Sequence, residues 1–190
     1  KGWVIIEKTL PGNDYRVLVI NGKMVAVAHR VPAHVIGNGK DTLQALIDRE
    51  NENPLRGYGH ENVLTEITVD HQTERLIEDA GYTLKSVLPK GEMLTLKTTA
   101  NLSTGGTAMD ITDEVHPANV HIAERAIRLI GLDIGGVDII APDLTTPLNE
   151  NGGGIVEINA APGFRMHLQP TSGLARNVAE PVIDMLFPPG

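Results

Sequence analysis

The chain has 190 residues, no cysteine and a formal net charge of −8, with 41% hydrophobic and 21% charged residues. This length and composition are typical of a globular domain with its own core, and the lack of cysteine excludes disulfides and thiolate metal sites. The negative charge argues against a general nucleic-acid binder, and no apolar run reaches the ~18 residues needed to cross a bilayer.

The N-terminal part of the chain has the character of β-structure. The apolar run 3–6 is expected to be a strand. Further along, Asn21-Gly22 separates two β-rich runs, and this dipeptide favours a type I′ hairpin turn. In a regular two-residue hairpin Arg16 pairs with Val27, so Arg16 and Arg30 fall on opposite faces. A bulge would have to correct this register for both arginines to reach one ligand.

Residues 37–93 are expected to form an inserted subdomain of helices and loops. Leu43, Leu46 and Ile47 have the spacing of one helical face. A second helical pattern ends at Gly81, a residue suited to a helix C-terminus.

The rest of the chain alternates between strand and helix patterns. The expected elements are a strand within 92–102, a polar loop at 103–117, a helix at 119–132, strands within 135–143 and 153–163, and a helix at 177–187. In the helix at 119–132, the shared apolar face is expected to carry Ile122, Ala126, Ile127 and Ile130.

Two carboxylates and an amide stand in the late apolar strands. Burying a carboxylate in a strand is costly unless something pairs with it. Glu157 and Asn159 are two positions apart and share a face, and Asp138 can join them if the two strands are neighbours. This all-oxygen set suits Mg²⁺, with water and phosphate oxygens as further ligands. The alternative is that these side chains cap turns or bind neighbouring loops.

A phosphate ligand would also need positive charge and hydrogen-bond donors. Arg16 and Arg30 in one hairpin modestly favour an anion site. The turn from Asn101 to the glycine pair 105–106 could aim backbone N–H groups at an anion, although an ordinary polar loop is the simpler interpretation. The P-loop and Rossmann fingerprints are not found, and no histidines have the H-E-x-x-H spacing of a zinc site.

Four segments carry a resemblance that covers essentially the whole chain. Residues 4–47, 100–120, 135–140 and 152–190 resemble the ATP-grasp region of the cyanophycin synthetase family. The ATP-grasp domain of bifunctional glutamate–cysteine ligase/glutathione synthetases is similar at 30–40, in the inserted helices and at 103–106. The resemblance implies an α+β fold: an ATP-grasp-type lobe with an antiparallel sheet, flanking helices and an inserted helical subdomain.

The resemblance also implies roles for individual residues. The residues that match the adenine and ribose contacts are Glu7, Lys8 and Leu10 for adenine and Asp14 for ribose. The magnesium ligands match Asp138, Glu157 and Asn159. Contacts to phosphates or to an acyl phosphate match Arg16, Arg30 and Asn101. Contacts to the acceptor or the carboxylate substrate would come from Arg165 and His167.

The activity implied is an ATP-dependent carboxylate–amine ligase that uses Mg²⁺. Its substrates would be a cyanophycin primer (multi-L-arginyl-poly-L-aspartate) and L-aspartate, with L-arginine added by a Mur-ligase-like domain. The family pattern includes a glycine-rich lobe upstream and that Mur-ligase-like domain downstream. Residues 1–190 are therefore expected to be a partial ATP-grasp domain, inactive alone, of a cytoplasmic homo-oligomer without nucleic-acid or membrane partners. The alternatives are a glutathione-forming ligase and a non-catalytic nucleotide-binding or scaffold fragment.

Overall fold

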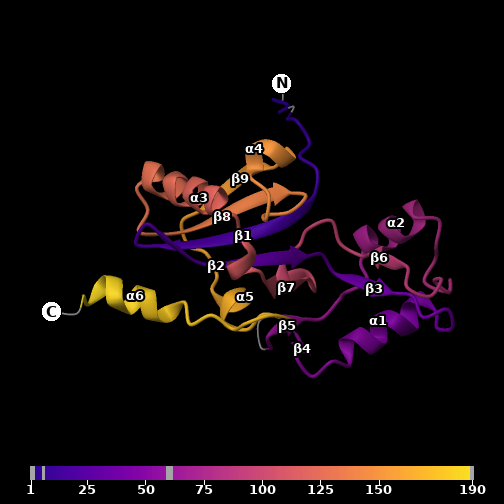
Figure 1. Ribbon diagram of the computed structural model, residues 1–190. Helices are drawn as coiled ribbons and strands as arrows, with labels where there is room; N and C mark the ends of the chain where they lie inside the picture. Colours follow the sequence, from indigo (N-terminus) through magenta and orange to yellow (C-terminus); the bar gives the residue numbers. More distant parts are fainter. Residues whose placement is uncertain (1–2, 6, 59–61, 189–190) are drawn as a thin grey trace. The chain divides into compact units, whose positions relative to one another are not determined.

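The structure, a computed structural model, describes residues 3–5, 7–58 and 62–188 (Figure 1). The described chain divides into two compact units. The first unit comprises the described residues up to His29 together with 110–164 and those from Arg176 on, and the second comprises 30–109 and 165–175. The region predicted as an insertion, 37–93, lies within the second unit.

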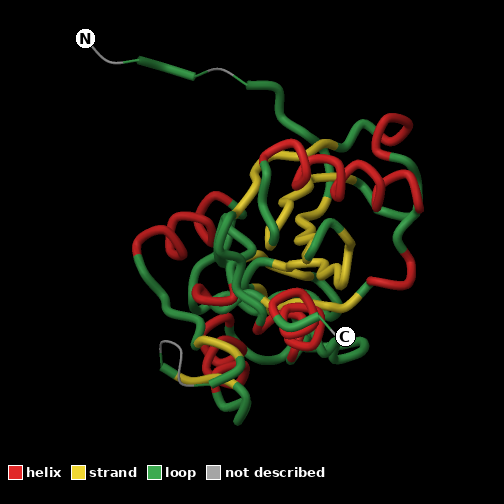
Figure 2. The backbone as a smooth tube through the Cα atoms, turned by 90° about the vertical axis from the view of Figure 1, so that its left-hand side faces the viewer, coloured by secondary structure: helices red, strands yellow, loops and turns green. Residues whose placement is uncertain are grey.

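An antiparallel sheet forms the centre of the first unit. Its strands, yellow in Figure 2, are β1 (Asn13–Ile20), β2 (Lys23–Val31), β7 (Thr107–Asp110), β8 (Ile134–Ala141) and β9 (Gly154–Asn159), in the order β7-β2-β1-β8-β9. The division between the units crosses β2 after His29, and only Asp110 of β7 belongs to the first unit. Asn21 and Gly22 have φ values of 50° and 71°, which confirms the predicted type I′ turn between β1 and β2.

Helices cover both faces of this sheet (Figure 1). On one face, α3 (Pro117–Ile130) packs Ala123 and Ile127 against odd-numbered residues of β1 and β8, near the short helix α4 (Leu148–Asn151). On the other face, Val178 and α6 (Ala179–Leu186) pack against Leu18 of β1. Burying one apolar stripe of each helix against the sheet is the main stabilising contribution in this unit.

Strand β2 contains a change of register, which was the predicted condition for Arg16 and Arg30 to reach one ligand. Val25 and Ala26 both pack in the cluster around Leu18, although consecutive strand residues should point to opposite faces. Val27 packs in the cluster on the other face. Two successive residues on one face indicate a β-bulge.

This bulge changes the face of the residues that follow it. The rings of His29 and Tyr15 lie 5.0 Å apart between centroids, which places His29 on the Tyr15 face. Alternation then puts Arg30 on the opposite face of β2, together with Ala26. The β1–β2 hairpin therefore does not keep the regular register, in which Arg16 and Arg30 would lie on opposite faces.

The second unit has its own core. Its elements are α1 (Leu43–Asn51), α2 (His71–Asp79), α5 (Arg165–Leu168) and the strand pairs β3 (His34–Ile36) with β6 (Met93–Thr95) and β4 (Arg56–Gly57) with β5 (Leu64–Thr65). Both helices predicted from the spacing of apolar residues are confirmed, with Leu43, Leu46 and Ile47 of α1 buried against Ile77 of α2. Thr42 and Asp70 cap the N-termini of α1 and α2 through their side-chain oxygens.

Three local predictions were wrong. Trp3–Ile5 is not a strand: these side chains are 82–101% exposed, so no packing offsets the entropy of ordering them. Ile6 lies outside the described residues. The polar loop 103–117 contains β7 and a 3₁₀ turn, Thr112–Glu114. Ile130 is 61% exposed, because the buried stripe of α3 follows Asn119, Ala123 and Ile127 instead.

No helix in the described part of the chain is both long and apolar enough to cross a membrane.

Candidate functional site

A row of charged side chains crosses three adjacent strands of the first unit. Arg16 of β1 pairs with Asp138 of β8, and Asp138 pairs with Glu157 of β9. Residues directly opposite one another in a sheet point to the same face. Asn159 pairs with Gly136, and it shares the Glu157 face because it lies two positions along. The strand pairing that the magnesium hypothesis required is therefore present.

A β-bulge in β9 brings Glu157 into this row. Asp138 pairs with Glu157 but the next residue, Ile139, pairs with Ile155, so Val156 is an extra residue. Without the extra residue, Asp138 would pair with Val156, and Glu157 would point to the opposite face. The bulge therefore turns a carboxylate towards Asp138, a re-aiming that bulges often perform near active sites.

Arg16 and Asp138 form a buried bidentate ion pair. The Nε atom of Arg16 donates to Oδ1 of Asp138, and Nη2 donates to Oδ2 at 3.0 Å. The two residues are only 8% and 6% exposed. A Cβ atom on Gly136 would lie 3.0 Å from Cδ of Arg16, so the glycine leaves room for the arginine side chain. The pair fixes both side chains in one orientation.

The remaining two members of the set, Glu157 and Asn159, differ in exposure. Glu157 is exposed. The Nδ2 atom of Asn159 is buried and has no hydrogen-bond partner, an arrangement that costs about 1–3 kcal/mol. Rotating the amide by 180° would present Oδ1 at the same place. A carboxylate has about four lone-pair sites, so Asp138 can still accept a cation beside Arg16.

The oxygen atoms of Asp138, Glu157 and Asn159 fit Mg²⁺, which takes oxygen ligands and keeps several waters. The described part of the chain holds no cluster of three or more acidic or histidine side chains that could bind a metal. The amide oxygen of Asn159 is therefore essential to this hypothesis.

The predicted nucleotide contacts also belong to the first unit. Glu7 and Lys8 are exposed and precede β1 in a segment without regular secondary structure. Leu10 is partly buried, and its Cδ1 atom lies 3.1 Å from where a Cβ on Gly154 would stand, at the start of β9. Asp14 lies in β1 two positions before Arg16 and so on the same face.

The other four predicted residues belong to the second unit. Arg30 is 6% exposed, and Asn101 is exposed immediately before the 3₁₀ turn η1 (Leu102–Thr104). Arg165 is partly buried, and its Nη1 atom donates to the carbonyl of Asn62 at 3.0 Å. His167 is 1% exposed, which places it among packed side chains rather than on a surface.

Sequence reasoning missed an ion-pair cluster in the first unit. The Nη2 atom of Arg176 lies 2.7 Å from a carboxylate oxygen of Asp110 and 2.7 Å from one of Asp113. Hydrogen bonds to these carboxylates raise the pKa of Arg176. Burial would raise the pKa of Asp110, but hydrogen bonds from Arg176 and Thr112 outweigh burial and lower it. No spacing in the sequence reveals the cluster, because 66 positions separate Arg176 from Asp110.

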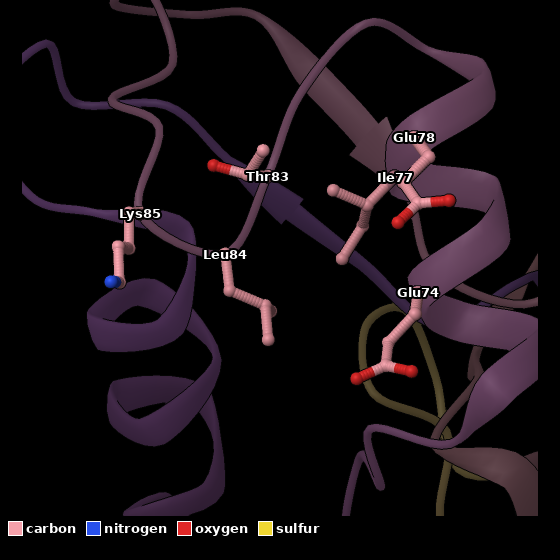
Figure 3. A pocket seen from close by; sticks show the side chains of 6 residues that line it. All are labelled: Glu74, Ile77, Glu78, Thr83, Leu84 and Lys85. Carbon is pink, nitrogen blue, oxygen red and sulfur yellow. The ribbon is translucent and has the colours of Figure 1, made fainter.

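A surface pocket of about 380 Å³ lies in the second unit (Figure 3). It is lined by Glu74, Ile77, Glu78, Thr83, Leu84 and Lys85. Figure 3 shows Ile77 and Leu84 between the glutamates of α2 and Lys85. None of the residues predicted as site residues lines this pocket.

Comparison with known proteins finds two kinds of relatives. No family model matches the chain. It is 59% identical to a cyanophycin synthetase from Geminocystis herdmanii (strain PCC 6308) over 97% of its own length and 21% of that protein. The chain is homologous to part of the cyanophycin synthetases. A cyanophycin synthetase from Synechocystis sp. (strain ATCC 27184 / PCC 6803 / Kazusa) is 56% identical over 98% of the chain. The chain thus spans about a fifth of the length of these cyanophycin synthetases.

The second predicted relative is also found. The bifunctional glutathione biosynthesis protein GshAB of Clostridium perfringens (strain 13 / Type A) is 35% identical over 97% of the chain and 24% of that protein. The crystal structure of a bifunctional glutathione synthetase from Pasteurella multocida matches 95% of the chain and 25% of that protein, with a TM-score of 0.80 and 35% identity. The predicted α+β class with an antiparallel sheet is confirmed, and cyanophycin synthetase is the more similar of the two relatives.

Proposed function

We propose that the chain is the metal-binding part of an ATP-dependent carboxylate–amine ligase of the ATP-grasp type. The observation that carries this proposal is the row Arg16–Asp138–Glu157 with Asn159 beside it, in a chain 59% identical to a cyanophycin synthetase. The full reaction would transfer the γ-phosphoryl group of ATP to a carboxylate and release ADP. The amine of L-aspartate would then attack the acyl phosphate, lose a proton and expel phosphate.

The row assigns different tasks to its members in this proposal. Asp138, Glu157 and Asn159 hold the cation through oxygen atoms. Arg16 keeps the Asp138 carboxylate in one orientation through two hydrogen bonds. Bound Mg²⁺ would supply positive charge next to the β- and γ-phosphates during phosphoryl transfer.

The remaining predicted residues complete the proposal around the nucleotide and the substrates. Adenine would lie against Glu7, Lys8 and Leu10, with Asp14 on the ribose. Arg30 and Asn101 would contact phosphate or acyl-phosphate oxygens, and Arg165 and His167 would contribute to the acceptor or carboxylate site.

The proposed substrates are a cyanophycin primer and L-aspartate, with L-arginine added elsewhere in a cytoplasmic, homo-oligomeric enzyme. The choice between this activity and glutathione formation is tested by offering the enzyme each pair of substrates. The complete enzyme is given Mg²⁺–ATP with cyanophycin primer and aspartate, or with γ-glutamylcysteine and glycine, and phosphate release is measured. We expect release only with primer and aspartate. Release only with the glutathione precursors would replace the proposal with the second activity.

A non-catalytic role is tested by binding and by substitution. We expect calorimetry to detect Mg²⁺–ATP binding to the complete enzyme, and we expect Asp138→Ala and Glu157→Ala each to abolish aspartate incorporation. A folded protein that gives no binding heat and incorporates no aspartate would favour a scaffold role. Unchanged incorporation in both variants would show that the metal assignment is wrong.

A further inference from the structure

The turn that begins at Asn101 has a buried side and an exposed side. The carbonyl oxygen of Asn101 accepts hydrogen bonds from the backbone N–H groups of Thr104 and Gly106, both at 3.1 Å. The side chains of Asn101 and Ser103 are exposed, whereas Gly105 and Gly106 are buried. The polar side chains can therefore meet a ligand only if the glycine side of the turn is held in place.

Arg56, in β4, holds that buried side. Its Nη1 atom donates to the carbonyl oxygen of Gly105 at 2.9 Å and to that of Thr65 at 2.8 Å. The side chain is 3% exposed, and its Nη2 atom lies 3.8 Å from a carboxylate oxygen of Glu50. Burial lowers the pKa of Arg56, and the Glu50 carboxylate opposes that shift. One buried guanidinium thus ties the turn to the strand pair β4–β5 through charge-assisted hydrogen bonds.

A second contact comes from Ile67, on the same side of the turn. A Cβ atom on Gly105, whose φ is 90°, would lie 2.8 Å from Cγ1 of Ile67. Asn51, the last residue of α1, donates to the carbonyl of Ile67 at 2.9 Å and accepts from its N–H at 2.8 Å. Helix α1 therefore supports the turn through Ile67, and only glycine fits at position 105.

We propose that Arg56 is a positioning residue that fixes the Asn101–Gly106 turn so that Asn101 can contact the transferred phosphoryl group or the acyl phosphate. This inference rests on the proposed function and extends it, because it gives the inserted helical region a task in the reaction. Without Arg56, the buried carbonyl of Gly105 loses the guanidinium that ties it to the strand pair β4–β5, and the turn is free to shift. Misplacement by about 1 Å can cost about 100-fold in rate.

The kinetic test compares Arg56→Gln with Arg75→Gln in the complete enzyme. Arg75 is an exposed arginine of α2, and its Nε atom lies 3.8 Å from a carboxylate oxygen of Asp79. We expect Arg56→Gln to lower kcat for aspartate incorporation by about 10- to 100-fold, Arg56→Lys to restore part of the rate, and Arg75→Gln to change it less than about 2-fold. In an Asn101→Ala background, Arg56→Gln should cost less than about 2-fold, because its effect passes through Asn101. A full loss in that background would overturn the proposal.

A structural readout keeps the test independent of the ligase activity. Amide hydrogen exchange at Thr104, Gly105 and Gly106 should become faster in Arg56→Gln but not in Arg75→Gln, while the amides of α1 and α2 keep their protection. Unchanged exchange in the turn would overturn the role of Arg56 even if the enzyme proves to have another activity. If the unsubstituted enzyme incorporates no aspartate but the exchange result is as expected, the proposed function fails and the positioning contact stands.

A second variant guards against a folding defect in Arg56→Gln. Gly105→Ala disturbs the same turn through Ile67 and leaves the guanidinium in place. We expect it to reproduce the loss in kcat, and normal kcat in a folded Gly105→Ala protein would contradict the proposal.

Discussion

Asp138 and Glu157 face each other across β8 and β9, yet their environments differ. Asp138 is 6% exposed and receives two hydrogen bonds from Arg16, whereas Glu157 is exposed to solvent. Removing the charge of Asp138 would leave Arg16 buried beside a neutral group. Glu157 makes no such buried ion pair, so a change at this position can affect ligand binding without a large effect on stability.

We predict different effects on stability for Glu157→Gln and Asp138→Asn. Glu157→Gln should change the free energy of unfolding by less than about 0.5 kcal/mol but lower Mg²⁺–ATP affinity at least about 10-fold by removing a charged oxygen ligand. Asp138→Asn should lower the free energy of unfolding by about 3 kcal/mol, because it breaks a buried ion pair. Urea denaturation and calorimetry measure the two quantities, with Glu150→Gln as an exposed control. Unchanged affinity in Glu157→Gln would remove this residue from the metal site.

Part of this row could be predicted from the sequence. Glu157 and Asn159 share a face because strand side chains alternate, and this requires only their spacing. The pairing of Arg16 with Asp138 joins positions 122 residues apart and depends on the register of β1 against β8. Spacing alone does not fix that register, so the ion pair could not be derived from the sequence.

At the scale of elements, the sequence predicted turns and helices correctly where interactions between nearby residues form them. The Asn21-Gly22 turn and helices α1 and α2 follow from backbone preference, capping side chains and apolar spacing. Strand β7 was missed because it has four residues and only Ala108 is buried among them. A strand of this kind exists through its pairing with β2, which leaves no pattern in its own sequence.

Helix α2 allows a prediction with a definite pH dependence. Its N-cap, Asp70, accepts from the N–H of Thr73 at 2.9 Å and pairs with the buried ammonium group of Lys97 at 2.6 Å. The hydrogen bond from Lys97, followed by that from Thr73, holds the pKa of Asp70 well below its usual value of 3.8. A depressed carboxyl pKa stabilises the folded state above the unfolded pKa, and this stabilisation is lost as the pH falls towards the folded pKa.

We therefore expect Asp70→Asn to lower the free energy of unfolding by about 1–2 kcal/mol at pH 7, because the buried Lys97 ammonium group loses its charged partner, whereas the amide oxygen can still cap α2. The difference from the unsubstituted protein should shrink as the pH is lowered below about 4. Urea denaturation at several pH values measures this difference. Asp79→Asn, at an exposed position of the same helix, is the control and should show no such trend. A difference that stays constant with pH would contradict the role assigned to the Asp70 charge.

At the scale of the whole molecule, the chain has two units with separate cores. The cluster around Ile127 and Val137 draws only on residues of the first unit. The cluster around Leu88 and Ile77 draws only on residues of the second. Each unit therefore has its own source of hydrophobic stabilisation. The predicted insertion at 37–93 captured most of the second core, but it omitted Ala33, Val35, Leu94 and Leu96, which lie in or next to β3 and β6.

Because the cores are separate, damage to one should remain in its own unit. Leu88→Ala and Ile127→Ala each remove a side chain that is 0% exposed, and such truncations cost about 2–5 kcal/mol. We expect Leu88→Ala to speed amide hydrogen exchange in α1 and α2 and to leave β1 and β8 protected, with the reverse pattern for Ile127→Ala. Exchange is measured residue by residue at 25 °C, and Leu129→Ala, at a 75% exposed position of α3, is the control for Ile127→Ala. Equal loss of protection in both units from either truncation would mean that the chain unfolds as one cooperative body, because a local cavity can spread its cost across a structure only when the parts open together.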